Sequence, residues 1–244
     1  QAQLLLDQSV VASKAFLSSE QSNLQSLALL VSQRPTLQRF LAEQSFSALE
    51  EYLITLRDGA NLDFLLVCSN GTDITGSEQN LNVAGLCNER EESGYIGLNP
   101  ADELYLYSSV NLELSQGTSF TVIVGKRMSS ILRELQTETG LRYFLIRQNQ
   151  VLEASDPTIA IDANQLEAML GKVNQGQQIS LPQRSFELSG HRYLPAVFEL
   201  DGPLSLDLIS ALNVDNQIEI QQSLSRTLLV GLLFILVIVS ALGI

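Results

Sequence analysis

The sequence predicts an α+β fold, and three observations lead to this prediction. Residues 1–33 carry apolar side chains at helical spacing, so the chain should begin with one long amphipathic helix. Later segments, such as ELYLYSSVNLEL, alternate apolar and polar residues as half-buried strands do. The two halves of the chain also resemble each other. Together these features predict antiparallel sheets covered by helices.

The long first helix should bury one face along its length. At about 1.5 Å per residue it reaches roughly 50 Å, which exceeds the width of a small domain. Pro35 suits the first turn of a second helix, and FSALEEYLITLRDG forms a third, which ends near Gly59. The residues that define the buried face of the first helix are Leu6, Val10, Ser13, Leu17, Leu24 and Leu27.

Strands and two further helices follow. Helical spacing runs from Lys126 to the residue before Gly140, and Asp162–Lys172 forms a short helix with Asp162 as its N-cap. Turns that contain Gly or Asn separate the strands. The predicted strands are Leu62–Cys68, Glu103–Leu114, Thr118–Gly125, Leu141–Ile146, Val151–Ala154, Gln178–Leu188, His191–Leu200 and Pro203–Leu212.

The two halves match at a shift of 79 residues. This shift places Leu53 on Leu132, Leu66 on Leu145, and Phe64 on Tyr143. Each half then consists of an amphipathic helix, a short connection, an apolar strand and a turn that contains Asn. We therefore expect a structural repeat.

The two cysteines bracket a polar, glycine-rich segment. Cys68 and Cys87 suit a disulfide formed in an oxidising compartment. The alternative is a pair of free thiols, with Cys68 buried at the end of its strand.

The C-terminal segment Thr227–Ile244 is apolar and carries no charge. Its length as a helix, about 27 Å, is close to the hydrocarbon thickness of a bilayer, so we expect a membrane span. A buried core helix is the alternative, although such a helix usually keeps a polar stripe. A helix should run from Val214 into this span without a break. We also expect another span before Gln1 and a further domain after Ile244.

The composition argues against several classes of function. With 27 acidic against 14 basic side chains the net charge is −13, which disfavours nucleic-acid binding. One His and two Cys cannot build a zinc site rich in these residues, and we expect neither a metal nor a cofactor. No motif for a catalytic nucleophile or a phosphate loop occurs. We interpret His191 as a lone surface histidine. We therefore expect that the chain is not an enzyme.

One stretch carries a resemblance to a known family. The segments TVIVGKRM, SSILRELQTETG and LRYFLIRQNQVLEASDP follow one another as strand, helix and strand. They resemble the start of the second module in extracytoplasmic double Cache sensor domains of bacterial transmembrane receptors. The resemblance covers nearly the whole chain. It implies that residues 1–35 form a signalling and dimerisation helix and that residues 36–125 form a membrane-distal PAS-like module. Residues 126–212 would then form a membrane-proximal PAS-like module, and residues 213–244 the juxtamembrane and transmembrane helix.

The resemblance also implies a ligand pocket between the sheet and the loops of the distal module. Tyr95, Tyr105, Tyr107 and Asp102 cluster there in sequence, and tyrosine suits small polar ligands. The alternative is that Tyr105 and Tyr107, two apart on a strand, simply face the core on one side. The amino-acid-binding members of the family use a Trp in the pocket. This chain has no Trp, so the resemblance does not imply that it binds an amino acid.

In the second module, Arg142 and Tyr143 are further candidate ligand-binding residues. Alternation along a strand requires one of them to point outward.

The resulting hypothesis is the sensor region of a membrane receptor, such as a sensor kinase of a two-component system, a cyclase or a chemoreceptor. The soluble part would be periplasmic or extracellular, would bind a small ligand or a partner, and would dimerise through its first helix. The alternative is a single-span or tail-anchored docking subunit that senses no ligand. A membrane-tethered enzyme is a third possibility, and no motif favours it.

Overall fold

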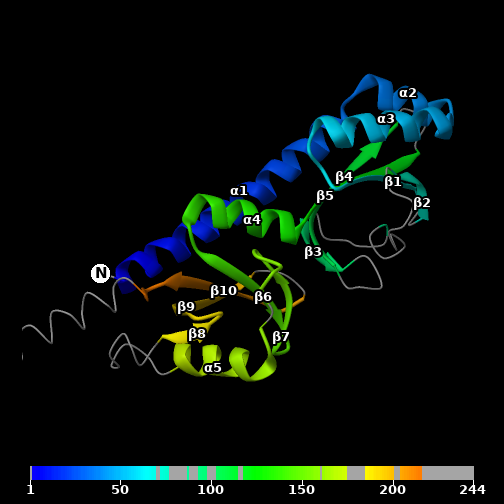
Figure 1. The fold of residues 1–244 in the computed structure, drawn as a ribbon. Coiled ribbons are helices and arrows are strands. Elements are labelled where there is room, and N and C mark those ends of the chain that lie inside the picture. The colour runs from blue at the N-terminus through cyan, green and yellow to red at the C-terminus, as the bar shows by residue number, and fades with distance from the viewer. Residues whose placement is uncertain are drawn as a thin grey trace, which may run out of the picture.

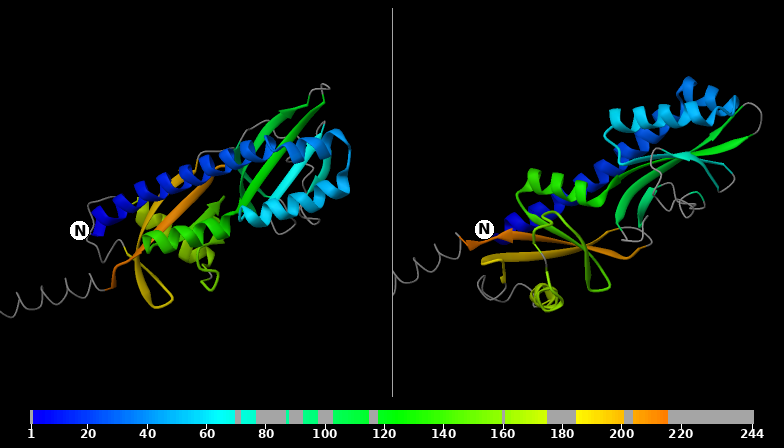
Figure 2. Two further views of the ribbon diagram at one scale, coloured as in Figure 1. Left: turned by 90° about the horizontal axis from the view of Figure 1, so that it is seen from above. Right: turned by 45° about the vertical axis from the view of Figure 1, so that its right-hand side comes forward.

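The computed structural model has two five-stranded antiparallel sheets that lie one after the other beside a long helix, α1 (Ala2–Ser32) (Figure 1). Two further views show that α1 runs alongside both sheets (Figure 2). The predicted α+β class with a long N-terminal helix is confirmed. The structure describes residues 2–69, 72–76, 87, 93–97, 103–114, 118–159, 161–174, 185–200 and 204–215.

The first module contains two helices and a sheet of strand order β2-β1-β5-β4-β3. The predicted second and third helices are confirmed as α2 (Pro35–Ala42), which begins at Pro35, and α3 (Phe46–Gly59). The strands are β1 (Phe64–Ser69), β2 (Thr72–Gly76), β3 (Ser93–Gly97), β4 (Leu104–Glu113) and β5 (Ser119–Arg127).

The second module repeats this arrangement with strand order β7-β6-β10-β9-β8. Its helices are α4 (Met128–Thr139) and α5 (Ala163–Asn174). Asp162 caps α5 as predicted, since its carboxylate accepts the Gln165 N–H at 2.7 Å and the Gln165 side chain accepts the Asp162 N–H in return. The strands are β6 (Arg142–Arg147), β7 (Gln150–Ala154), β8 (Phe186–Leu188), β9 (His191–Leu200) and β10 (Leu206–Asn213).

The predicted repeat is therefore real, but its register of 79 residues is wrong by one in the strands. The pairing of β1 with β2 shifts between Val67 and Cys68, and that of β6 with β7 shifts between Leu145 and Ile146. From Val67 to Leu145 the shift is 78 residues. A slip of one residue turns side chains to the opposite face. Phe64 and Tyr143, matched by the shift of 79, consequently lie on opposite faces of their sheets.

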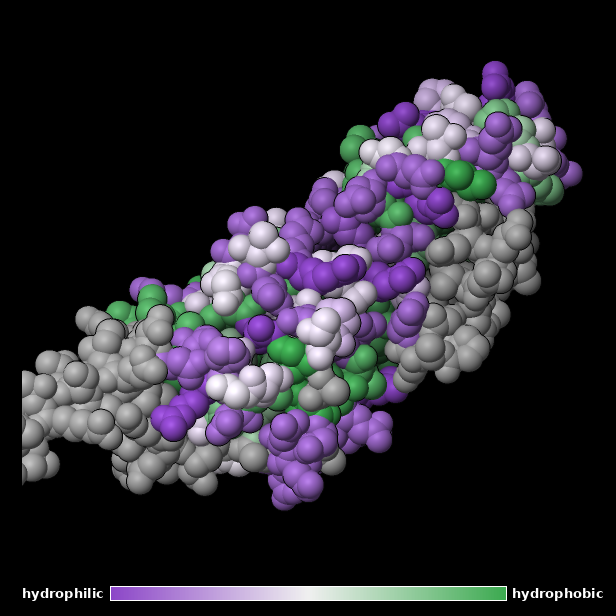
Figure 3. Space-filling view, viewed as in Figure 1, coloured by the Kyte–Doolittle hydropathy of each residue, from purple (hydrophilic) through white to green (hydrophobic). Residues whose placement is uncertain are grey.

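α1 buries one stripe of side chains against both modules. Leu17 and Leu24 belong to a single hydrophobic cluster that also contains Val124 of the first sheet and Leu145 and Leu208 of the second. This confirms the predicted buried face, with Leu6, Ser13, Leu17 and Leu24 buried and Val10 and Leu27 partly buried. On the face of the molecule seen in Figure 3, hydrophilic residues predominate and hydrophobic patches lie between them. The two modules thus share one core.

Two polar contacts fix α1 beside this core. The Tyr143 hydroxyl lies 2.8 Å from the hydroxyls of both Ser13 on α1 and Thr139 on α4. Burial raises the pKa of Tyr143, and the two hydroxyl partners offset this only in part. Further along α1, Glu20 accepts a hydrogen bond from the Lys126 ammonium at 2.8 Å, with both side chains mostly buried. Buried polar pairs of this kind define one position for the helix.

The start of α1 and the end of β10 lie together. Leu6 packs in one cluster with Leu194 and Val214. The Val214 N–H donates to the Arg192 carbonyl at 2.9 Å, and the Asp215 carboxylate accepts the Arg192 N–H and contacts His191 at 2.8 Å. Both ends of the described chain therefore leave the second module from the same side (Figure 1).

None of the helices within the described ranges is long and apolar enough to cross a bilayer. The predicted span at 227–244 lies outside these ranges, as does the predicted helix after Asp215.

The modules also meet at Glu153 on β7. Its carboxylate accepts a hydrogen bond from the Leu104 N–H at the start of β4. Burial raises the pKa of Glu153 above its ordinary value of 4.5; the Leu104 hydrogen bond, Arg127 and Arg133 oppose this rise, and Glu103 adds to it. Compared with the unfolded chain, the folded protein therefore binds the proton of this carboxyl more tightly.

We predict that Glu153→Gln stabilises the protein at neutral pH. A raised folded pKa contributes stability that is present below pH 4.5 and lost as the pH rises through the folded value. The uncharged variant should therefore unfold at a higher urea concentration than the wild type at pH 7, and the difference should shrink below pH 4.5. Glu187→Gln, at an exposed site on β8, is the control. A less stable Glu153→Gln protein at pH 7 would contradict the prediction.

Candidate functional site

The candidate site is the face of the first sheet that points away from α1, called here the outer face. Its side chains form a hydrophobic cluster separate from the shared core. Strand alternation explains the separation, because neighbouring residues such as Leu65 and Leu66 point to opposite sides. The outer face comprises Phe64, Leu66, Cys68, Tyr105, Tyr107 and Ile123.

The structure separates the tyrosines that the sequence grouped together. Tyr105 and Tyr107 share the outer face and are buried, at 1% and 2% exposure. Tyr95 pairs with Leu106 in the β3–β4 register and lies in the cluster that α1 covers. Tyr105 and Tyr107 thus stay together as candidates, and Tyr95 belongs to a different environment. Asp102 lies outside the described residues.

The predicted disulfide between Cys68 and Cys87 is present, with a Cα–Cα distance of 5.6 Å. Cys68 belongs to the outer-face cluster, and the half-buried Cys87 packs against that cluster. The disulfide therefore attaches residue 87 to the outer face.

A glycine on β5 allows two aromatic rings to meet on the outer face. Phe64 and Tyr105 pack edge to face with ring centroids 5.5 Å apart. Gly125 pairs with Phe64 across β1 and β5, and a Cβ at this position would lie 2.2 Å from the Phe64 ring. Only glycine leaves room for the ring at this place.

Charged groups lie at the end of the outer face nearest the second module. The Tyr105 hydroxyl donates to Glu103 at 3.3 Å, and the Arg127 guanidinium lies 5.7 Å from the Tyr105 ring centroid. The Asp63 carboxylate accepts a hydrogen bond from the backbone N–H of Arg127 at 2.7 Å. Burial lowers the pKa of Arg127, but Tyr105, Glu103 and Asp63 outweigh this and raise the pKa. The site thus joins an apolar surface to a guanidinium group that has two carboxylates beside it.

The sequence did not single out Phe64, Glu103, Asp63 or Arg127 as members of the site. Glu103 directly precedes β4 and lies two residues before Tyr105, so alternation from Tyr105 offered a signal for Glu103. The place of Arg127 depends on the β4–β5 register, in which it pairs with Tyr105, and no local pattern predicts that register.

In the second module, Arg142 and Tyr143 point to opposite faces, as alternation predicted. Tyr143 faces α1 and bonds to Ser13, whereas Arg142 pairs with Asp156 at 2.6 Å and lies 5.8 Å from the Tyr193 ring centroid. The hydrogen bonds from Thr158 and Arg142 lower the pKa of Asp156.

The same face of the second sheet is filled by helix α5. Leu166 and Met169 of α5 are buried in one cluster with Phe144, Ile146 and Tyr193 of the sheet. Among the described residues no α-helix contributes to the corresponding cluster of the first module, so its outer face is the better candidate for binding.

The described residues offer little for catalysis or metal binding. No three of their His, Cys, Asp or Glu side chains lie close enough together to hold a metal ion. The His191 ring, which contacts Asp215, helps to hold the end of β10.

Comparisons with known proteins give the fold. No protein-family model matches the chain, and no curated protein sequence matches it. Among solved structures, the periplasmic domain of Vibrio cholerae LuxQ aligns with a TM-score of 0.60 and 11% identity, covering 84% of this chain and 98% of that one. The sensor domain of the V. cholerae histidine kinase DctB aligns with a TM-score of 0.54 and 12% identity, covering 87% of this chain and 98% of that one.

A third similar structure is the sensory domain of the Campylobacter jejuni chemoreceptor Tlp3 with isoleucine bound. It aligns at a TM-score of 0.50 and 14% identity, covering 86% of this chain and 90% of that one. The expected resemblance to Cache-type, PAS-like sensor domains is therefore confirmed for the fold. The LuxQ structure is a periplasmic domain, and the DctB and Tlp3 structures are sensor domains of a histidine kinase and a chemoreceptor.

We predict that Gly125→Ala destabilises the protein by about 1–3 kcal/mol, because the new methyl group displaces the buried Phe64 ring. Gly171→Ala on α5 is the matched control: nothing lies within 4 Å of its added Cβ, and alanine favours a helix. Urea unfolding measures both variants. Equal stability of the two variants would contradict the proposed close approach of Phe64 to β5.

We also predict that the double variant Cys68→Ser, Cys87→Ser loses about 3 kcal/mol of unfolding free energy, because the open chain gains conformational freedom when unfolded. Denaturant unfolding with and without reductant measures this. The reduced wild type should match the double variant. The prediction would be contradicted if the unfolding midpoint of the wild type were the same with and without reductant.

Proposed function

We propose that this chain is the extracytoplasmic sensor region of a transmembrane signalling receptor. The supporting observation is the shared fold: LuxQ, DctB and Tlp3 contribute periplasmic or sensory domains with the same architecture over more than four fifths of this chain. Under this proposal the first module, residues 36–125, is distal to the membrane, and the second, residues 126–212, is proximal.

The proposed ligand site is the outer face of the distal sheet. Tyr105 and Tyr107 supply apolar rings and hydroxyl groups, and Arg127 with Glu103 supplies charge at one end. Such a surface suits a small molecule with an apolar part and a polar or anionic group. The Tlp3 structure holds isoleucine. This chain has no Trp, so its ligand would be recognised by different side chains.

The signal would leave through the two chain ends. α1 contacts both modules and begins beside the end of β10, where Leu6 meets Val214. A ligand that favours one position of α1 would move this junction, and the segment from Val214 would pass the shift to a span at 227–244. Sliding of packed helices by about 1–2 Å is an established mode of switching.

A homodimer would form along α1 and relay the shift. Large apolar side chains remain exposed on this helix, with Leu4 at 62%, Val11 at 69% and Leu30 at 58% exposure. Parallel packing of two such helices would cover them.

A ligand screen on the full chain tests the proposal, with thermal stabilisation as the readout. For a ligand found in this way, Tyr107→Phe should weaken binding by about threefold to tenfold, because one hydrogen bond is lost while the ring remains. Tyr52→Phe, whose ring packs on Phe40 of α2, is the matched control and should bind normally.

A ligand that binds Tyr107→Phe and the wild type equally tightly would argue against the outer face. The absence of any stabilising small molecule would favour the alternative, a membrane-anchored docking subunit.

A further inference from the structure

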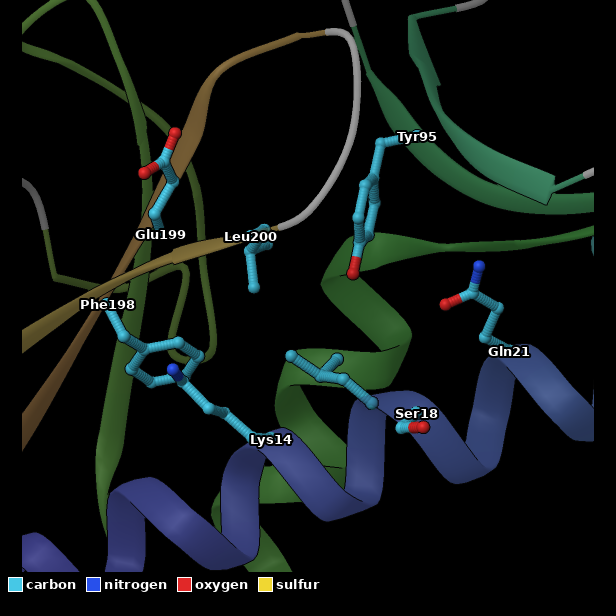
Figure 4. Close-up of a pocket in the computed structure, with 8 residues that line it drawn as sticks. Lys14, Ser18, Gln21, Tyr95, Phe198, Glu199 and Leu200 are labelled. Carbon is cyan, nitrogen blue, oxygen red and sulfur yellow. The ribbon is translucent and has the colours of Figure 1, made fainter. Parts of the chain in front are cut away.

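A cavity of about 290 Å³ lies at the junction of the two modules, on the opposite side of the distal sheet from the outer face. Its walls come from α1, from β3 of the distal sheet and from β9 of the proximal sheet (Figure 4). Three elements far apart in sequence therefore meet around one space. Small-molecule sites occur preferentially at such interfaces between modules.

One part of the cavity is apolar. Leu17 on α1 is 5% exposed, and Phe198 and Leu200 on β9 are each 6% exposed. Phe198 and Leu200 point toward α1 because alternation places them on the inner face of β9. These side chains provide a dry surface for the apolar body of a ligand.

The other part carries polar groups from two elements. Figure 4 shows the Tyr95 hydroxyl directed toward α1, which contributes the Gln21 amide and, lower in the view, the Ser18 hydroxyl. Tyr95 is 8% exposed, so its ring forms part of the wall.

The charge that faces the cavity is positive. The Lys14 ammonium lies 5.4 Å from the Phe198 ring centroid, and within the described parts of the chain no carboxylate pairs with it. Glu199 also borders the cavity, but its carboxylate points away from α1 (Figure 4). Glu20 is already paired with Lys126. A ligand anion would therefore meet an available cation at the apolar wall.

We propose that this junction cavity is a second binding site, for a small monocarboxylate with an apolar body. The carboxylate would pair with Lys14 and accept a hydrogen bond from the Ser18 or Tyr95 hydroxyl, while the body would lie on Leu17, Phe198 and Leu200. The volume is at the lower end of that of known ligand pockets, which suits a small acid. Because the ligand touches α1 and both modules, it stabilises their present arrangement.

Phenylacetate is the probe, and phenylacetamide is its uncharged counterpart of nearly the same shape. On the full chain, isothermal calorimetry should show saturable binding of phenylacetate and at least tenfold weaker binding of phenylacetamide. Lys14→Gln should reduce phenylacetate binding about tenfold or more. The control Glu199→Gln should bind like the wild type, since its carboxylate points away.

A second variant locates the site without disturbing buried packing. Ser18 is exposed on α1, so Ser18→Phe fills the cavity from its rim and should abolish phenylacetate binding while thermal unfolding stays unchanged. Tyr107→Phe, on the outer face, should leave phenylacetate binding intact. The proposal is overturned if phenylacetate does not bind, if phenylacetamide binds equally well, or if Ser18→Phe still binds the acid.

Discussion

The packing of one stripe of α1 against both sheets is the interaction on which the rest of the structure depends. Neither sheet has an inner core of its own, because Leu17, Leu24, Val124, Leu145 and Leu208 belong to one cluster. A fully buried leucine contributes about 1.5–3 kcal/mol. The stripe therefore holds the two modules in a fixed relation, and a shift of α1 in one module must change its packing in the other.

Because side chains alternate along each strand, the two faces of each sheet have different roles. The inner faces hold α1 and build the shared core, so they have little freedom to vary. The outer faces differ at equivalent positions: Phe64 and Tyr105 form a ring pair in the first module, where the second has Arg142 over Tyr193. The second face is then filled by α5, and the first carries the candidate ligand site. The junction cavity is a separate feature, formed where α1 crosses from one module to the other.

Much of this architecture can be predicted from local patterns. The helical spacing of α1, the proline at the start of α2 and the alternation in β4 and β9 each specify an element. The strands β2 and β3 were missed, because they are short and lie in a polar, glycine-rich segment that resembles a loop. The Cys68–Cys87 disulfide was predicted because two cysteines bracket one polar, glycine-rich segment.

The site could be predicted only in part, because it depends on long-range registers. Tyr95 shares a sequence neighbourhood with Tyr105, yet its pairing with Leu106 sends it to the inner face. The close approach of Phe64 to Gly125 and the position of Arg127 beside Tyr105 arise from pairings between distant strands. The repeat was visible in sequence, but its one-residue slip between helix and strand required the sheet pairing.

The coupling of the two modules through α1 is tested most directly by native-state hydrogen exchange on a Leu17→Ala variant of the full chain. Leu17 lies at the junction and is buried in the shared core. The account predicts that this truncation lowers the protection of amides in β5 and β10 together, although neither strand is altered. Loss of protection in α1 and one module alone, with the other module unchanged, would contradict it.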